Sequence, residues 1–214
     1  GLSKISGLAK TAKKFDMPAL ALTDHGAMYG AIEFYKECKK QGVKPIIGVE
    51  GYLAARTRHD KEAGIDSKRC HITLLAKNTT GYKNLIRLTT HAHLEGYYYK
   101  PRMDKEILRL YHEGIICLSG CPASEMGRAL RAGDLATARE LVKEYQEIFG
   151  KENYFLEVMN HPEVEGAPLY IEGIKTLAKE FNIPIVGTHD SHYLHAEDRD
   201  AHETLLRINT GTDA

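Results

Sequence analysis

Short apolar runs alternate with longer amphipathic stretches along the chain. The runs are dense in aliphatic and β-branched residues, as strands buried on both faces are. The stretches between them carry apolar residues at three- and four-residue spacings, which is typical of helices that pack by one face. This alternation predicts βα units around a parallel sheet, that is, an α/β fold. The six predicted strands span residues 18–23, 44–54, 71–77, 114–120, 154–159 and 183–188.

The chain begins with an expected amphipathic helix within residues 1–15 that places Ile5, Leu8, Ala9 and Ala12 on one face. Gly42 and Gly150 stand where helix C-caps are expected. No internal repeat, low-complexity tract or linker is evident, so we expect a single domain over residues 1–214. Five further helices are predicted over residues 30–41, 80–94, 105–111, 134–150 and 168–182.

Residues suited to metal binding follow most of the predicted strands. In parallel α/β folds the carboxyl ends of the strands open on one face, and function collects there. Imidazole, carboxylate and thiolate are the usual protein ligands of transition metals. The residues after successive strands are Asp24-His25-Gly26, Glu50, Cys121, Asn160-His161 and His189-Asp190-Ser191-His192.

Each of these residues also has an ordinary structural explanation. An isolated Asp24-His25-Gly26 is more often a turn whose aspartate caps a helix. An isolated Cys121 is more often a small buried hydrophobic residue. Asp190 and His192 are a stronger signal, because a two-residue spacing on an extended segment points both side chains the same way. Taken together, the set favours a metal site.

Composition and charge limit which ligands and which cellular locations suit this chain. The 214 residues contain 29 Lys and Arg and 29 Asp and Glu, so the formal charge is zero and any contact with nucleic acid must be local. No apolar stretch is long enough to span a membrane or to act as a secretory signal. The four cysteines form no CxxC pair, which favours a reducing, cytoplasmic location. We interpret His59, His91, His93, His112, His195 and His202 as surface or packing residues.

Several blocks identify a family. TDHGAMYGAIEFYKECKKQGVKPIIGVEGYLA, HITLLAKNTTGYKNLIRL, HLEGYYYKPRMD, GIICLSGC and THDSHYLHAEDRDAHETLL occur in this order. They closely resemble the PHP (polymerase and histidinol phosphatase) domain of bacterial replicative DNA polymerase III alpha subunits. The resemblance implies a distorted seven-stranded β/α barrel, similar to a TIM barrel, of which six strands are recognisable here. It also implies a trinuclear metal centre, usually zinc, although manganese, magnesium or iron would also suit such ligands.

The resemblance also implies the ligands. It assigns metal binding to His25, Glu50, His71, Cys121, Asp190 and His192, with Glu50 bridging two metals and with Asp190, Glu50 and His25 in the catalytic role. His71 opens its predicted strand, so the strand-end argument speaks against it and only the resemblance selects it. Four other residues are interpreted either as phosphate or DNA 3′-end contacts or as solvated side chains: Lys100, Arg102, Asn160 and His161.

The family's chemistry is metal-dependent phosphodiester hydrolysis, a 3′ to 5′ exonuclease action on DNA 3′ ends. The implied parent protein is a DNA-directed DNA polymerase, whose remaining parts supply most of the DNA affinity. One alternative is a non-catalytic scaffold that stabilises the polymerase and docks a separate proofreading exonuclease. Another is a small-molecule phosphatase of the histidinol phosphatase type, which HLEGYYYKPRMD and AHETLL disfavour.

The family begins with a strand that carries an HxH motif, followed by a YSxLDG stretch, and Gly1-Leu2-Ser3 matches the end of that stretch. We therefore expect these residues to be a piece of the subunit that lacks the first strand. Such a piece would hold at most one metal firmly, through Glu50, His71 and Cys121, with weak or no exonuclease turnover. It would perform no nucleotidyl transfer, because INTGTDA precedes any palm domain.

Overall fold

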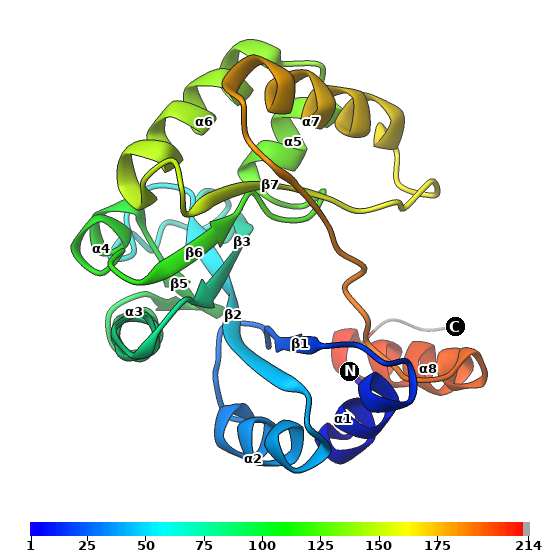
Figure 1. The fold of residues 1–214 in the computed structure, drawn as a ribbon. Helices are drawn as coiled ribbons and strands as arrows, with labels where there is room; N and C mark the ends of the chain where they lie inside the picture. Colours follow the sequence, from blue (N-terminus) through cyan, green and yellow to red (C-terminus); the bar gives the residue numbers. More distant parts are fainter. Residues whose placement is uncertain (212–214) are drawn as a thin grey trace. The chain divides into compact units, whose positions relative to one another are not determined.

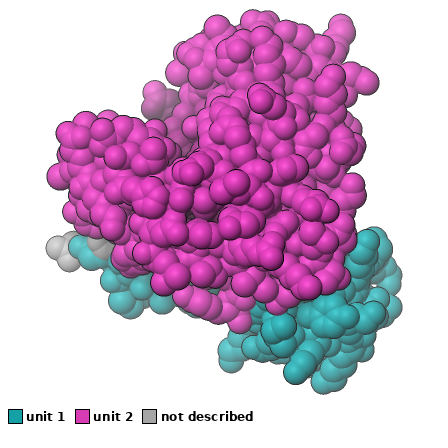
Figure 2. Space-filling model, turned by 90° about the vertical axis from the view of Figure 1, so that its left-hand side faces the viewer, with its two compact units in different colours: residues 1–21, 30–46, 189–214 teal, residues 22–29, 47–188 magenta. Residues whose placement is uncertain are grey.

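The computed structural model describes residues 1–211, and the last residues of the predicted domain, 212–214, lie outside the described residues. The chain divides into two compact units, coloured separately in Figure 2. Unit 1 contains residues 1–21, 30–46 and the segment from residue 189 onward. Unit 2 contains residues 22–29 and 47–188.

Unit 1 contains the first two helices of the chain. Helix α1, Ile5–Lys14, buries Ala9 and Ala12, as its amphipathic pattern predicts, and packs against α2, Ala31–Gln41. Gly42 ends α2 in the left-handed conformation, with φ of 72°, because a residue without Cβ adopts it at little cost. The 3₁₀ helix η1, Ala196–Asp198, and α8, Arg199–Thr210, were not predicted.

All six predicted strands form, and two short ones join them. The sheet order is β4-β5-β2-β3-β6-β7-β8, and β1 also pairs with β2. This order has two ends, at β4 and at β8, so the described strands make an open mixed sheet. The α/β fold class is confirmed. The strands are β1 Ala19–Leu22, β2 Lys44–Ala54, β3 Arg69–Ala76, β4 Tyr97–Tyr98, β5 Lys100–Met103, β6 Ile115–Leu118, β7 Tyr154–Val158 and β8 Ile185–Gly187.

Two strands run against the expectation of a wholly parallel sheet, and the shorter of them, β4, is antiparallel to β5. Strand β3 is antiparallel to both of its neighbours, β2 and β6. The β2–β5, β6–β7 and β7–β8 pairs are parallel, as predicted for βα units. The segment between β2 and β3 contains no helix, so it makes no crossover that would carry the chain back to start a parallel strand. The beginning of β3 therefore lies at the carboxyl end of β2.

Helices cover one face of the unit 2 sheet, as Figure 1 shows for α6 and α7 beside β6 and β7. Successive side chains of a strand point to opposite faces of the sheet. On the face that the helices cover, Val49, Leu74 and Leu156 join the apolar core. Their neighbours Glu50, Thr73 and Glu157 point to the other face. No helix among the described residues is long and apolar enough to cross a bilayer. The helices are α3 Thr79–Leu94, α4 Lys105–Leu110, α5 Glu125–Arg131, α6 Leu135–Phe149 and α7 Ala167–Phe181, of which α5 was not predicted.

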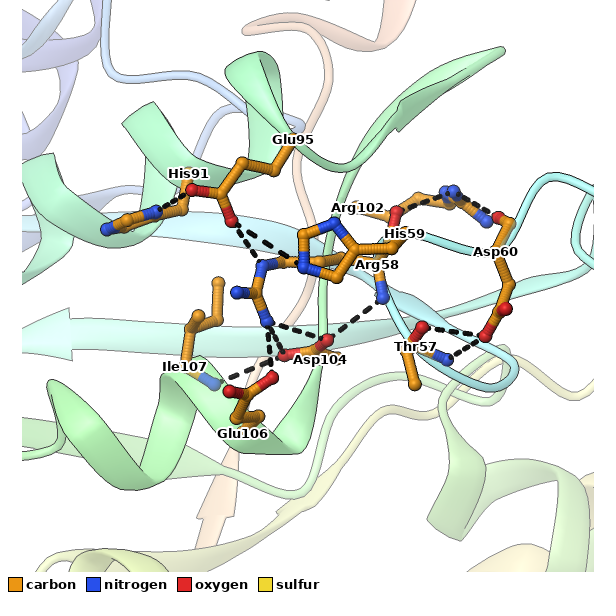
Figure 3. Close-up of polar contacts among 10 residues, drawn as sticks. All are labelled: Thr57, Arg58, His59, Asp60, His91, Glu95, Arg102, Asp104, Glu106 and Ile107. Carbon is orange, nitrogen blue, oxygen red and sulfur yellow. Dashed lines mark hydrogen bonds and ion pairs between the residues drawn. The ribbon is translucent and has the colours of Figure 1, made fainter.

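An ionic network centred on the buried Arg58 and Asp104 fastens the β2–β3 loop to the neighbouring elements (Figure 3). The Arg58 guanidinium donates to Glu95 Oε2 at 2.6 Å, to Glu106 Oε2 at 2.8 Å and to both Asp104 oxygens at 3.0 and 3.1 Å. Asp104 also caps α4, because its Oδ1 accepts the Ile107 N–H. Arg58 thereby connects the end of α3 to the start of α4.

This network predicts an acid-dependent loss of stability. The hydrogen bond from Arg58, with a further one from His91, lowers the pKa of Glu95 from 4.5 to about 2. A carboxyl whose pKa is lower in the folded state stabilises fully above its unfolded pKa and loses this effect as the pH falls through its folded pKa. We expect Glu95→Gln to lower the thermal midpoint at pH 7, with the gap to the wild type narrowing between pH 4.5 and 2. A gap that stays constant over that range would contradict the assignment.

Candidate metal centre

The register of β2 and β3 gathers four polar side chains on one face of the sheet. Tyr52 pairs with His71, and Glu50 pairs with Thr73. Residues two apart on a strand share a face, and cross-strand partners point the same way, so all four side chains lie together. His71 reaches this group because β3 is antiparallel and starts at the edge where β2 and its parallel neighbours end.

His25 joins this group from the end of β1. Its backbone forms an isolated parallel bridge with Glu50, in which the Glu50 N–H donates to Asp24 O and the Gly26 N–H donates to Glu50 O. Gly26 has φ of 66° and packs closely on Tyr52 and Pro101, so the turn of the chain requires glycine there. The bridge holds His25 directly beside Glu50.

The Glu50 carboxylate lies between two imidazoles and contacts each with a different oxygen. Its Oε1 lies 2.6 Å from Nδ1 of His71, and its Oε2 lies 3.2 Å from Nδ1 of His25. The Glu50 side chain is 9% exposed, whereas that of His25 is 42% exposed. The site is therefore open to solvent on the His25 side and closed around the carboxylate.

Cys121 approaches the same carboxylate from the loop after β6. Its Sγ lies 3.5 Å from Nδ1 of His71 and 3.9 Å from Oε1 of Glu50. Gly120, with φ of 87°, and Ser124, which caps α5, form the tight turn that carries it. Cys117, which the sequence placed in the core, is buried on the apolar face.

The electrostatics of the group favour a cation. The hydrogen bonds to Cys121 and then to Glu50 raise the pKa of His71 from 6.5 to about 10, against the effect of burial. His25, Glu50 and His71 each offer one ligand atom, and these atoms lie within 4.8 Å of one another. Imidazole, carboxylate and thiolate in such proximity form a donor set that suits zinc and related transition metals. The residues present thus fit a metal site.

Asp190 and His192, the other two predicted ligands, belong to unit 1. His192 Nδ1 lies 2.8 Å from the backbone oxygen of Asp190 and 3.7 Å from its Oδ1, so the pair is adjacent. Asp190 has φ of 52°, an unusual conformation for a residue with a Cβ. The participation of this pair in the metal site stays a prediction.

The predicted phosphate contacts differ in their surroundings. Lys100 is exposed, and its Nζ lies 6.0 Å from the centre of the Tyr52 ring, next to the His25 and His71 group. Asn160 is exposed after β7, and His161 lies beside it with Nδ1 3.1 Å from Oε1 of Glu163. Arg102 does not fit this role. Its side chain is fully buried and donates four hydrogen bonds to backbone oxygens, so the guanidinium serves the fold.

Sequence reasoning missed two residues of this face. Tyr52 packs its ring 6.0 Å from that of His25 and 5.5 Å from that of His71. Glu157, 2% exposed, accepts hydrogen bonds from Thr188 Oγ1 at 2.6 Å and from Thr73 Oγ1 at 3.2 Å. The signal for Glu157 was a charged residue inside the apolar run YFLEVM, which is costly unless it is paired.

Comparison with known sequences places the chain in a family. The family model of the PHP domain matches residues 1–161. DNA polymerase III subunit alpha of Treponema pallidum is 45% identical over 98% of this chain, and that of Thermus aquaticus is 44% identical over 99%. The chain spans 18% of the length of each of these relatives.

A solved structure shares the fold. It is that of a protein from Bifidobacterium adolescentis, provisionally assigned as a metal-dependent phosphoesterase. The similarity covers 97% of this chain and 92% of that one, with a TM-score of 0.50 and 12% sequence identity. At this identity the likeness concerns the arrangement of the helices and strands.

Proposed function

Because the chain belongs to the PHP domain family, we propose that it is the PHP domain of a bacterial DNA polymerase III alpha subunit and that it hydrolyses phosphodiesters at DNA 3′ ends. The polymerase context follows from the relatives, which carry that name and match nearly the whole chain. In this proposal DNA binds through the remainder of the subunit as well, in keeping with the zero net charge of the chain.

One observation carries the proposal: the Glu50 carboxylate directs one oxygen to His71 and Cys121 and the other to His25. A carboxylate whose two oxygens face different ligand groups suits the bridging role between two metals that the family resemblance implies. The residues that would hold metal are His25, Glu50, His71 and Cys121, joined in the proposal by Asp190 and His192. A bound divalent cation would supply positive charge to polarise the phosphate and to acidify water.

The chain's own residues would position this chemistry. Glu50 and Cys121 are buried and keep the ligand atoms in place, while the more exposed His25 borders the side from which a phosphodiester enters. Lys100 beside Tyr52 offers a positive charge to a phosphate oxygen. The four cysteines have free thiols, which agrees with the cytoplasmic location that we propose.

The proposed activity is tested on a primer with a 3′ mismatch. We expect the purified chain to release the terminal nucleotide slowly and only with added divalent metal, and excess chelator should stop this release. Asp190→Ala should abolish excision, with Asp198→Ala, a neighbouring carboxylate outside the predicted ligand set, as its matched control. Metal bound at the expected residues with no excision by the wild type would favour the scaffold that docks a separate proofreading exonuclease.

A further inference from the structure

The turn between β4 and β5 presents aromatic side chains to solvent beside the metal centre. Tyr97 is 55% exposed and Tyr99 is 65% exposed, while Lys100 extends from the same turn. Exposed tyrosines also occur elsewhere in the chain, such as Tyr35, so exposure alone assigns no role and the surroundings of this turn decide.

The turn is close to the ligands because β1 and β5 share one edge of β2. Strand β3 pairs with the other edge of β2. Along the edge that β1 and β5 share, His25 bridges to Glu50, and β5 pairs with β2 two residues further on, at Tyr52. Pro101 packs on Gly26, and Lys100 Nζ lies over the Tyr52 ring. The Tyr52 ring in turn contacts both histidines. A chain molecule whose end occupies the metal centre can therefore extend onto this turn.

Tyr99 occupies a backbone conformation that disfavours it. Tyr98 pairs with Lys100, which leaves Tyr99 alone at the tip of the turn with φ of 60°. Glycine would adopt this angle without steric conflict, and a bulky residue there is a strained outlier of the kind that clusters at binding sites. Burial does not compensate the strain, because most of the side chain is exposed. Its ring contacts only the edge of Tyr98 among the ring contacts of the described residues, at 4.7 Å.

The buried Arg102 side chain fixes the β4–β5 turn to the neighbouring loop. Arg102, two residues after Lys100, donates to Gly96 O, Asp66 O, Arg58 O and Asp60 O, and its guanidinium packs on the Tyr98 ring at 5.3 Å. Three of these acceptors, in Arg58, Asp60 and Asp66, lie in the β2–β3 loop. Figure 3 shows Arg102 beside the Arg58 and Asp104 network, which anchors that loop. A surface that is already ordered loses little conformational entropy when it binds a ligand.

From these contacts we propose that the β4–β5 turn is a subsite for unpaired DNA: Tyr99 stacks on a base near the 3′ end, and Lys100 contacts a backbone phosphate. Stacking on aromatic rings with nearby cations is how proteins hold single strands without reading their sequence. Arg69, whose guanidinium lies 5.5 Å from the Tyr52 ring centre, adds positive charge on the same side. This inference deepens the proposed function and rests on it for the identity of the polymer.

Binding is measured without hydrolysis, so that the two proposals can fail separately. Fluorescence anisotropy of a labelled oligothymidylate, with chelator and at low salt, reports the affinity of the 214-residue chain. Tyr99→Gly and Tyr99→Ser should each weaken binding by about tenfold, the loss expected for one base stack. Tyr99→Phe should bind within about twofold of the wild type because it keeps the ring. Tyr35→Ser, an exposed tyrosine on α2, is the matched control and should bind normally.

Two further results separate binding from folding. Tyr99→Gly should raise the thermal midpoint, because it relieves the positive φ, whereas a tyrosine kept for structural reasons would lower the midpoint when removed. Lys100→Ala should make the plot of log affinity against log salt less steep by about one, the change expected when one phosphate contact is lost. If the chain does not bind the single strand, prefers duplex, or binds equally well as Tyr99→Gly, the subsite is refuted, whatever the excision assay gives.

Discussion

Glu50→Gln is expected to lose metal binding almost completely. The substitution keeps the shape of the side chain but replaces the charged oxygen pair that faces His25, His71 and Cys121 with a neutral amide. Removing an anionic ligand from such a group should weaken zinc affinity by more than about 100-fold, beyond the range seen for outer hydrogen-bond partners. Competition with a chromophoric zinc chelator measures this change.

The control for Glu50→Gln is Glu147→Gln, which alters an exposed carboxylate on α6. The control should bind zinc as the wild type does and keep its excision rate. Circular dichroism and the thermal midpoint confirm that Glu50→Gln is folded before its affinity is interpreted. A folded Glu50→Gln protein with wild-type zinc affinity would show that the metal lies elsewhere in the chain.

Arg58→Met is expected to destabilise the fold by about 3–5 kcal/mol, the cost of leaving a buried charge without its partner. The Asp104 side chain is only 4% exposed, and both of its oxygens accept from Arg58. Methionine preserves much of the side-chain volume, so the effect reports the ion pair rather than a cavity. Urea unfolding with a common slope measures the free energy of unfolding.

A matched arginine tests whether burial causes this effect. Arg109 pairs with Glu144 at 2.8 Å, but its side chain is 47% exposed. Arg109→Met should therefore cost about 0–1 kcal/mol, as exposed ion pairs do. Equal losses for the two variants would mean that the Arg58 network contributes no more than a surface contact. The double variant with Asp104→Asn should recover part of the Arg58→Met loss, because it removes the unpaired charge.

Local sequence pattern was sufficient for most elements of the fold. The apolar runs located β2 and β7 because a strand buried along its length needs consecutive aliphatic residues. Gly42 marked the end of α2 because its left-handed conformation depends on the residue itself. The family resemblance, carried by blocks such as TDHG and LSGC, is confirmed by the PHP model and by the polymerase relatives.

The tertiary structure decided which of these residues meet. The direction of β3 depends on its loop and neighbours, so strand-end reasoning spoke against His71, although antiparallel pairing brings it to Glu50. The sequence also does not distinguish a buried arginine from a solvated one, since three of the four backbone oxygens that accept from Arg102 come from a loop about 40 residues away. Residue type and local period are properties of a short segment, whereas strand direction, burial and ligand distance are set by contacts between distant segments.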